Sequence, residues 1–189
     1  MLVKETVLEV AKSRMNSSGL NPFVLYQTKD GTCYLISFSF QSQSDKEYAV
    51  ILGNLIAYMI QAESFSFVSE VWFKALSPKE KQPNIPISEM EDRIEGLLLV
   101  SQEREEGGFY IWETLRDDTG VVTGFKETDF GEEVKGPSGL MTRWLVVPQN
   151  GVVLPKGVTT PEELITFFAP AFSNPPILVR MDTTPHTIH

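Results

Sequence analysis

The sequence predicts an α+β fold with a single domain: one antiparallel sheet, partly a meander, with helices packed on it. Stretches in which every second residue is apolar alternate with stretches of helical spacing, in the order α-β-β-α-β-β-β-β-α. The later strands are separated by turns too short for anything except antiparallel neighbours. A chain of 189 residues, 42% of them hydrophobic, is also long enough to bury a core. We expect one domain over residues 1–189, with a core α+β unit at 1–130 and an extension at 131–189 whose short helix packs on the core.

The first elements are a helix and a β-hairpin. Apolar residues at helical spacing predict a helix over residues 5–15, and Gly19 follows it as a candidate left-handed cap. Residues 23–27 and 33–40 read as two strands, joined by a turn at residues 29–31. Tyr34, Ile36, Phe38 and Phe40 share one face and alternate with Cys33, Leu35, Ser37 and Ser39, which is typical of a half-buried antiparallel strand.

The second helix has the strongest pattern in the sequence. Ser44 and Glu47 have the spacing of a capping box, in which two side chains satisfy unpaired amides at the helix start. Ile56 and Ile60 widen the apolar face beyond a surface stripe, so we expect a central helix that the sheet covers well. The apolar face consists of Tyr48, Ile51, Leu52, Leu55, Met59 and Ala62.

The next part of the chain predicts a run of strands. A strand over residues 65–75 precedes a Pro-rich, charged loop at 77–95, where Ser88 and Glu91 have the spacing to cap a short helical turn. The meander follows, with strands at 97–103, 109–116 and 121–127 and turns at 106–108 and 117–120.

The C-terminal part has one clear helix start. Thr160 precedes Pro161, and Glu163 follows, which is the pattern of a capped helix with proline in its first position. Pro170 limits the length of this helix, and a brief apolar run follows at 177–179. The pattern at 138–147 fits a short helix or a strand equally well.

Composition excludes several classes of function. The formal net charge of −9 and scattered basic residues disfavour direct nucleic-acid binding, which needs cations to replace counterions around phosphates. No window is apolar enough to span a bilayer, and the N-terminus lacks a secretion signal, so we expect no membrane contact. The single cysteine, Cys33, lies in an apolar run, so we expect it to be a small buried residue. One cysteine and no secretion signal predict a protein of the reducing cytoplasm.

Residue sets for common chemistries are missing. Both histidines, His186 and His189, lie in the last four residues, which disfavours nucleophilic schemes that need an oriented imidazole. Asp118-Thr119-Gly120 matches the short signature of aspartic proteases, but the preceding Arg116 and Asp117 favour an ordinary turn. We expect no metal and no cofactor, since one cysteine excludes a structural zinc site and no loop has calcium-binding spacing.

One polar cluster deserves a functional hypothesis. Glu70 shares a strand face with Val68 and Trp72, and a carboxylate there must be paired, hydrogen-bonded or at an edge. Arg93 is a candidate partner, in which case an ion pair pins the long loop to the sheet; the alternative is a ligand or catalytic pocket. We assign no catalytic residue, and the other members of the cluster are Ser69, Trp72, Ser88, Glu89 and Glu95.

These residues resemble a family of uncharacterised bacterial and phage proteins. The matching segments are Val68-Ser69-Glu70-Val71-Trp72, then Pro86-Ile87-Ser88-Glu89, then Arg93-Ile94-Glu95 before an apolar strand. Here Ile87 separates the proline from the serine that adjoins it in the family pattern. The resemblance covers roughly residues 45–105 and implies no activity, so it draws attention to Glu70 and Arg93 without assigning them a role.

We therefore expect a non-enzymatic binding or regulatory module whose partner is another protein or a second copy of the chain. An enzyme, such as a hydrolase or a metal-dependent enzyme centred on Glu70, is the first alternative and requires a concave pocket with convergent polar groups. An acidic inhibitor that imitates DNA is the second, and it requires carboxylates spaced like phosphates along one face. An interaction module requires an exposed apolar or strongly acidic patch.

Overall fold

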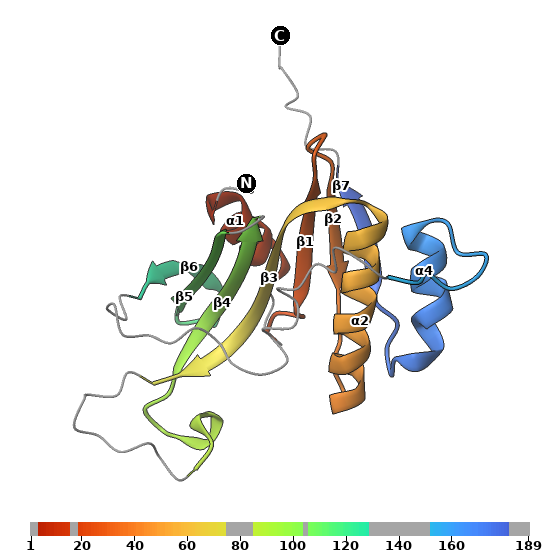
Figure 1. The fold of residues 1–189 in the computed structure, drawn as a ribbon. Helices are drawn as coiled ribbons and strands as arrows, with labels where there is room; N and C mark the ends of the chain where they lie inside the picture. Colours follow the sequence, from red (N-terminus) through yellow and green to blue (C-terminus); the bar gives the residue numbers. More distant parts are fainter. Residues whose placement is uncertain (1–3, 16–18, 75–84, 104–105, 129–151, 182–189) are drawn as a thin grey trace.

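Seven strands form one antiparallel sheet in the order β6-β5-β4-β3-β1-β2-β7. The computed structural model of the chain describes residues 4–15, 19–74, 85–103, 106–128 and 152–181, and Figure 1 shows their arrangement. The strands are β1 (Phe23–Thr28), β2 (Cys33–Ser37), β3 (Ala62–Phe73), β4 (Ile94–Glu103), β5 (Glu106–Arg116), β6 (Val122–Glu127) and β7 (Ile177–Met181). The helical elements are α1 (Lys4–Arg14), α2 (Gln43–Met59), α4 (Pro161–Phe168) and the 3-10 turns η1 (Ile87–Glu89) and η2 (Ala169–Ala171).

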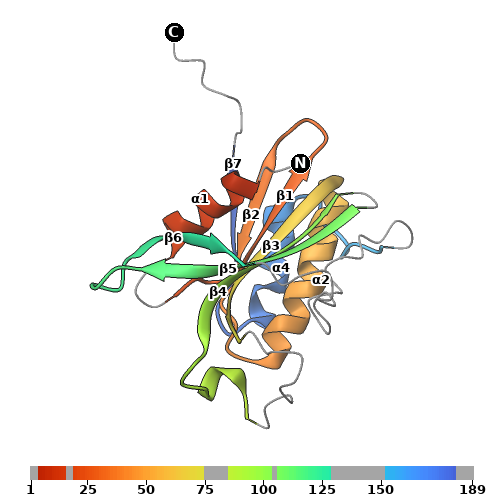
Figure 2. The ribbon, with the colours of Figure 1, turned by 90° about the vertical axis from the view of Figure 1, so that its left-hand side faces the viewer.

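The two faces of the sheet carry separate hydrophobic cores. Alternate residues of one strand point to opposite faces, so Phe67 packs under α2 while its neighbour Val68 packs under α1. Figure 2 shows α1 and α2 on opposite sides of the sheet, which twists strongly between β1 and β6. The helix α4 lies beside α2 and contributes the buried Leu164 to the same core.

This architecture confirms the predicted fold class, and the order of elements agrees with the expected one up to α4. The apolar run at 177–179 belongs to a further strand, β7, which pairs with β2 at the edge of the sheet. The predicted strand at 33–40 was too long, and the prediction of one buried face was wrong, because Leu35 is buried under α1 while Ile36 is buried under α2.

Two turn predictions need correction. Residues 106–108, expected as a turn, belong to β5, where Gly107 and Gly108 pair with β4. Ser88 lies in η1, but no side chain caps this 3-10 turn, which follows Pro86. The region 138–147 and both histidines lie outside the described residues.

The start of α2 differs from the prediction by two residues. The capping box is formed by Ser42 and Asp45, not by Ser44 and Glu47. The predicted box at Thr160 and Glu163 is confirmed, with Pro161 at the first position of α4. No helix that the structure describes is long and apolar enough to cross a membrane.

Candidate functional site

Glu70 is held by the segment that follows α1. The strand β3 directs its side chain to the α1 face, two residues after the buried Val68. Its Oε2 accepts a hydrogen bond of 3.0 Å from the backbone amide of Leu20. Gly19, at φ +99°, lies so close that a Cβ built there would be 2.4 Å from the same oxygen. The carboxylate therefore fastens the chain after α1 to the middle of the sheet.

Glu95 forms an ion pair on this face, and its partner is Arg116. The Nε of Arg116 donates to both carboxylate oxygens, at 3.1 and 2.9 Å, and its Nη2 also donates to Glu95. The hydrogen bonds that Arg116 donates to Glu95, together with the charge of Glu95, raise the pKa of Arg116, and the charge of Glu70 adds to the effect. Arg116 also donates to the carbonyl of Gly120 at 2.7 Å, so the pair ties β4 to the β5–β6 turn.

The structure brings Arg93 and Trp72 together and divides the rest of the predicted cluster among different parts of the molecule. Arg93, the partner that we considered for Glu70, lies over the ring of Trp72, with its Cζ 4.6 Å from the ring centroid. Ser69 points to the α2 face, opposite Glu70, and its hydroxyl donates to a backbone carbonyl. Ser88 and the exposed Glu89 lie in η1, outside the sheet.

Sequence reasoning placed Arg116 at the end of the strand predicted over residues 109–116 but missed its pairing with Glu95. The signal that identifies it is alternation, since Trp112, Thr114 and Arg116 share one face of β5 with Glu95 on the neighbouring strand. The Oγ1 of Thr114 is buried and has no hydrogen-bond partner. The contacts of this face favour a structural role for Glu70 and Glu95: each accepts a hydrogen bond that joins segments distant in the sequence.

Asp45 is the fully buried carboxylate of the described residues, at 1% exposure. Its Oδ2 accepts from the backbone amides of Gln41 and Ser42, at 2.7 and 2.9 Å, and its Oδ1 from the amide of Ser173 at 3.0 Å. The hydrogen bond from Ser173, then that from Gln41, lowers the pKa of Asp45 to about 2. Asp45 therefore remains ionised while it joins the start of α2 to the chain between α4 and β7.

These contacts make stability depend on pH in a defined window. The folded-state pKa of Asp45 lies below its ordinary value of 3.8, so its contribution is complete above that value and is lost as pH falls toward about 2. We expect Asp45→Asn to lower the free energy of unfolding at neutral pH, with a difference from the wild type that shrinks between about pH 4 and pH 2. Denaturant unfolding at a series of pH values measures this difference. The control is Asp118→Asn, which removes a charge from an exposed turn. If the difference between Asp45→Asn and the wild type stays constant with pH, it contradicts the low pKa of Asp45.

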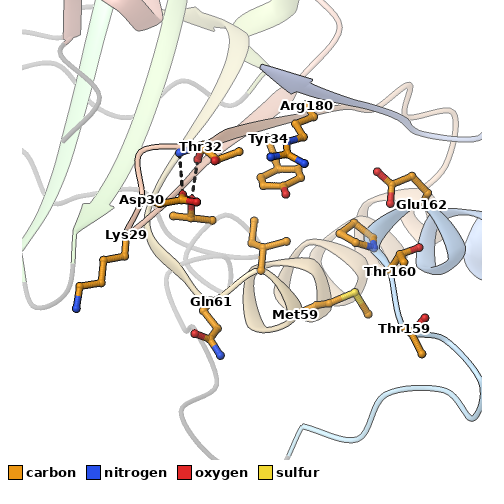
Figure 3. A pocket seen from close by; sticks show the side chains of 13 residues that line it. Lys29, Asp30, Thr32, Tyr34, Met59, Gln61, Thr159, Thr160, Glu162 and Arg180 are labelled. Atoms are coloured by element: carbon orange, nitrogen blue, oxygen red, sulfur yellow. Dashed lines mark hydrogen bonds between the residues drawn. The ribbon is translucent and has the colours of Figure 1, made fainter. Parts of the chain in front are cut away.

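The structure also contains a cavity of about 540 Å³ between the β1–β2 turn, the end of α2, the start of α4 and β7. Figure 3 shows that polar side chains line it. Asp30 already accepts hydrogen bonds from Thr28 and Thr32, and Thr160 takes part in the helix cap. The basic residues of the lining are Lys29 and Arg180, the acidic ones Asp30 and Glu162, so the charges balance. The formal charge of the cavity walls is therefore zero, and it favours neither an anionic nor a cationic ligand.

Gln61, at the end of α2 on the rim of this cavity, has an unfavourable backbone conformation. Its φ of +51° is one that glycine adopts at little cost, and its amide donates to the carbonyl of Tyr58 at 3.2 Å. We expect Gln61→Gly to raise the free energy of unfolding by about 0.5 to 1 kcal/mol. Thermal melting compares it with Gln61→Ala, which keeps the strain and should give no gain. A loss of stability in Gln61→Gly would show that contacts of the glutamine side chain outweigh the strain.

Among the helices that the structure describes, α2 exposes more large apolar side chains than any other. Tyr48, Ile51 and Tyr58 are 39%, 47% and 41% exposed, and the half-buried Leu55 lies between them. Their spacing of three, four and three residues places all four on one side of the helix. We call these four residues the α2 stripe. The opposite side of α2 is buried, which corrects the prediction that the sheet covers Tyr48 and Ile51.

Comparisons with known proteins assign no role to these features. The chain matches no protein family model, and no curated protein or solved structure is detectably similar to it. Among the residues that the structure describes, no group of three or more His, Cys, Asp or Glu side chains is arranged to hold a metal ion.

Proposed function

We propose that the chain is a non-enzymatic protein-interaction module that binds its partner through the α2 stripe. The observation that carries the proposal is the exposure of Tyr48, Ile51 and Tyr58 on one side of a helix whose other side is buried. Contiguous apolar side chains on a surface mark sites of association, and tyrosine is enriched in such sites because its ring is apolar and its hydroxyl tolerates water.

The charge distribution supports this location. The chain has a formal net charge of −9, yet it has no charged residue between Glu47 and Glu63. The cores of protein interfaces are depleted in charged residues and enriched in aromatic ones, so this helix resembles an interface core more than an ordinary solvated face. The lone buried cysteine, Cys33, is consistent with a partner in the reducing cytoplasm.

The experiment is photo-crosslinking in the cells that produce the protein. A photoreactive amino acid replaces Ile51 in the α2 stripe, or replaces Val121, which is 59% exposed in the β5–β6 turn. We expect protein adducts from position 51 and few from position 121, whatever the identity of the partner. Equal labelling at the two positions, or no adduct at position 51, would overturn the proposal.

A further inference from the structure

We infer that the partner of the α2 stripe is a second copy of this chain, bound with the two α2 helices antiparallel. This inference rests on the proposed function and names the partner of the same surface. A two-fold contact uses the same patch on both chains, so the patch must be complementary to itself.

The spacing of the α2 stripe meets that requirement. The intervals from Tyr48 to Ile51, Leu55 and Tyr58 are three, four and three residues, which read the same in both directions. With the two-fold axis at the level of Gly53 along the helix, on the side of the α2 stripe, Tyr48 of each copy faces Tyr58 of the other, and Ile51 faces Leu55. Aromatic side chains then meet at both ends of the contact, and branched aliphatic side chains meet in its middle.

Charge favours the antiparallel arrangement over the parallel one. A parallel pair would bring Glu47 of one copy against Glu47 of the other, at the same end of two aligned helix dipoles. In the antiparallel pair each Glu47 lies opposite Met59, and the two carboxylates are separated by about 18 Å along the helix, beyond the screening length at physiological salt. The facing segments from Tyr48 to Tyr58 contain no charged side chain, so two copies with a net charge of −9 each can approach there.

The size of the α2 stripe predicts weak association. The stripe extends about 15 Å along the helix, while a stable specific interface buries about 800 Å² on each partner. Four side chains of this kind cover less than that, so we expect a dissociation constant on the order of 10 to 100 µM. The dimer then forms or dissociates with the concentration of the chain.

Sedimentation equilibrium of the purified chain of 189 residues tests the inference at about 5 to 500 µM, a range that brackets this constant. The wild type should pass from the mass of one chain to that of two. Ile51→Glu, which places an unpaired carboxylate in the contact, should weaken association at least about tenfold. Val121→Glu makes the same charge change on a similarly exposed side chain and should leave association unchanged. A wild type that stays monomeric, or a dimer that Ile51→Glu does not weaken, overturns the inference.

Cysteine crosslinking tests the orientation. A mixture of Tyr48→Cys and Tyr58→Cys chains should form a mixed disulfide, while Tyr48→Cys alone should not link to itself; the reverse result overturns the antiparallel arrangement. The inference about the second copy can fail while the proposed function holds. Adducts of position 51 with a different protein, together with a monomeric purified chain, would keep the interaction module and reject the second copy as its partner.

Discussion

Gly19→Ala is expected to lower the free energy of unfolding by about 3 kcal/mol, of which roughly 1 to 2 come from the left-handed backbone. The rest arises because the added Cβ occupies the place of the Glu70 carboxylate, 2.4 Å from its Oε2. That carboxylate, the end of a flexible side chain, must then turn away from the amide of Leu20, and a part-buried amide that loses its acceptor costs up to about 1 to 3 kcal/mol. Denaturant unfolding of the variant and the wild type measures the loss.

The matched control is Gly120→Ala. Gly120 also has a positive φ, of +81°, but a Cβ there would meet nothing within 4 Å. This variant should therefore show the backbone cost alone. The close contact with Glu70 contributes nothing if the two alanine variants lose the same free energy of unfolding. The same follows if Gly19→Ala costs as much in a chain in which Glu70 is also alanine.

Arg116→Met should cost about 2 to 3 kcal/mol, since it leaves the carboxylate of Glu95 without its charged partner. The side chains of Arg116 and Glu95 are only 23% and 17% exposed, so water replaces little of what is lost. A double-mutant cycle with Glu95→Gln should give a coupling energy of about 1.5 kcal/mol or more, because bonds to charged groups are the stronger class.

The neighbouring pair of Lys126 and Glu113 is the control for this cycle. This pair joins β5 to β6 by a single contact of 3.3 Å, but the side chains of Lys126 and Glu113 are 68% and 36% exposed. Exposed pairs contribute little, so its coupling should not exceed about 0.5 kcal/mol. Equal coupling energies in the two cycles would contradict the structural role that we give to Arg116 and Glu95.

The sequence was sufficient for the fold class because period-two and helical patterns record which side chains face the core. It also predicted the cap of α4, where Thr160, Pro161 and Glu163 act within one turn of helix. At the start of α2, two overlapping pairs have the same spacing, Ser42 with Asp45 and Ser44 with Glu47. The amide of Ser173, 128 residues away, binds Asp45 and distinguishes the two pairs. No local pattern contains that contact.

The polar cluster shows the same limit of local patterns. The strand pattern correctly indicated that the Glu70 carboxylate needs a partner, and charged side chains such as Arg93 were the candidates that the sequence offered. The structure supplies a backbone amide from Leu20 instead. Every residue except proline has such an amide, so it leaves no signature in the sequence. The α2 stripe was hidden for a related reason: Ile51 and Leu52 are equally apolar, and only the position of α4 and the sheet decides which of them is buried.

The most direct test of our account compares glutamate at two adjacent positions of α2. Ile51 is 47% exposed and Leu52 is 0% exposed. In dilute solution, Ile51→Glu should change the free energy of unfolding by no more than about 0.5 kcal/mol, as surface substitutions do, whereas Leu52→Glu should cost 3 kcal/mol or more, roughly the cost of an unpaired buried charge. A large loss for Ile51→Glu would place Ile51 in the core and contradict the α2 stripe as a binding surface.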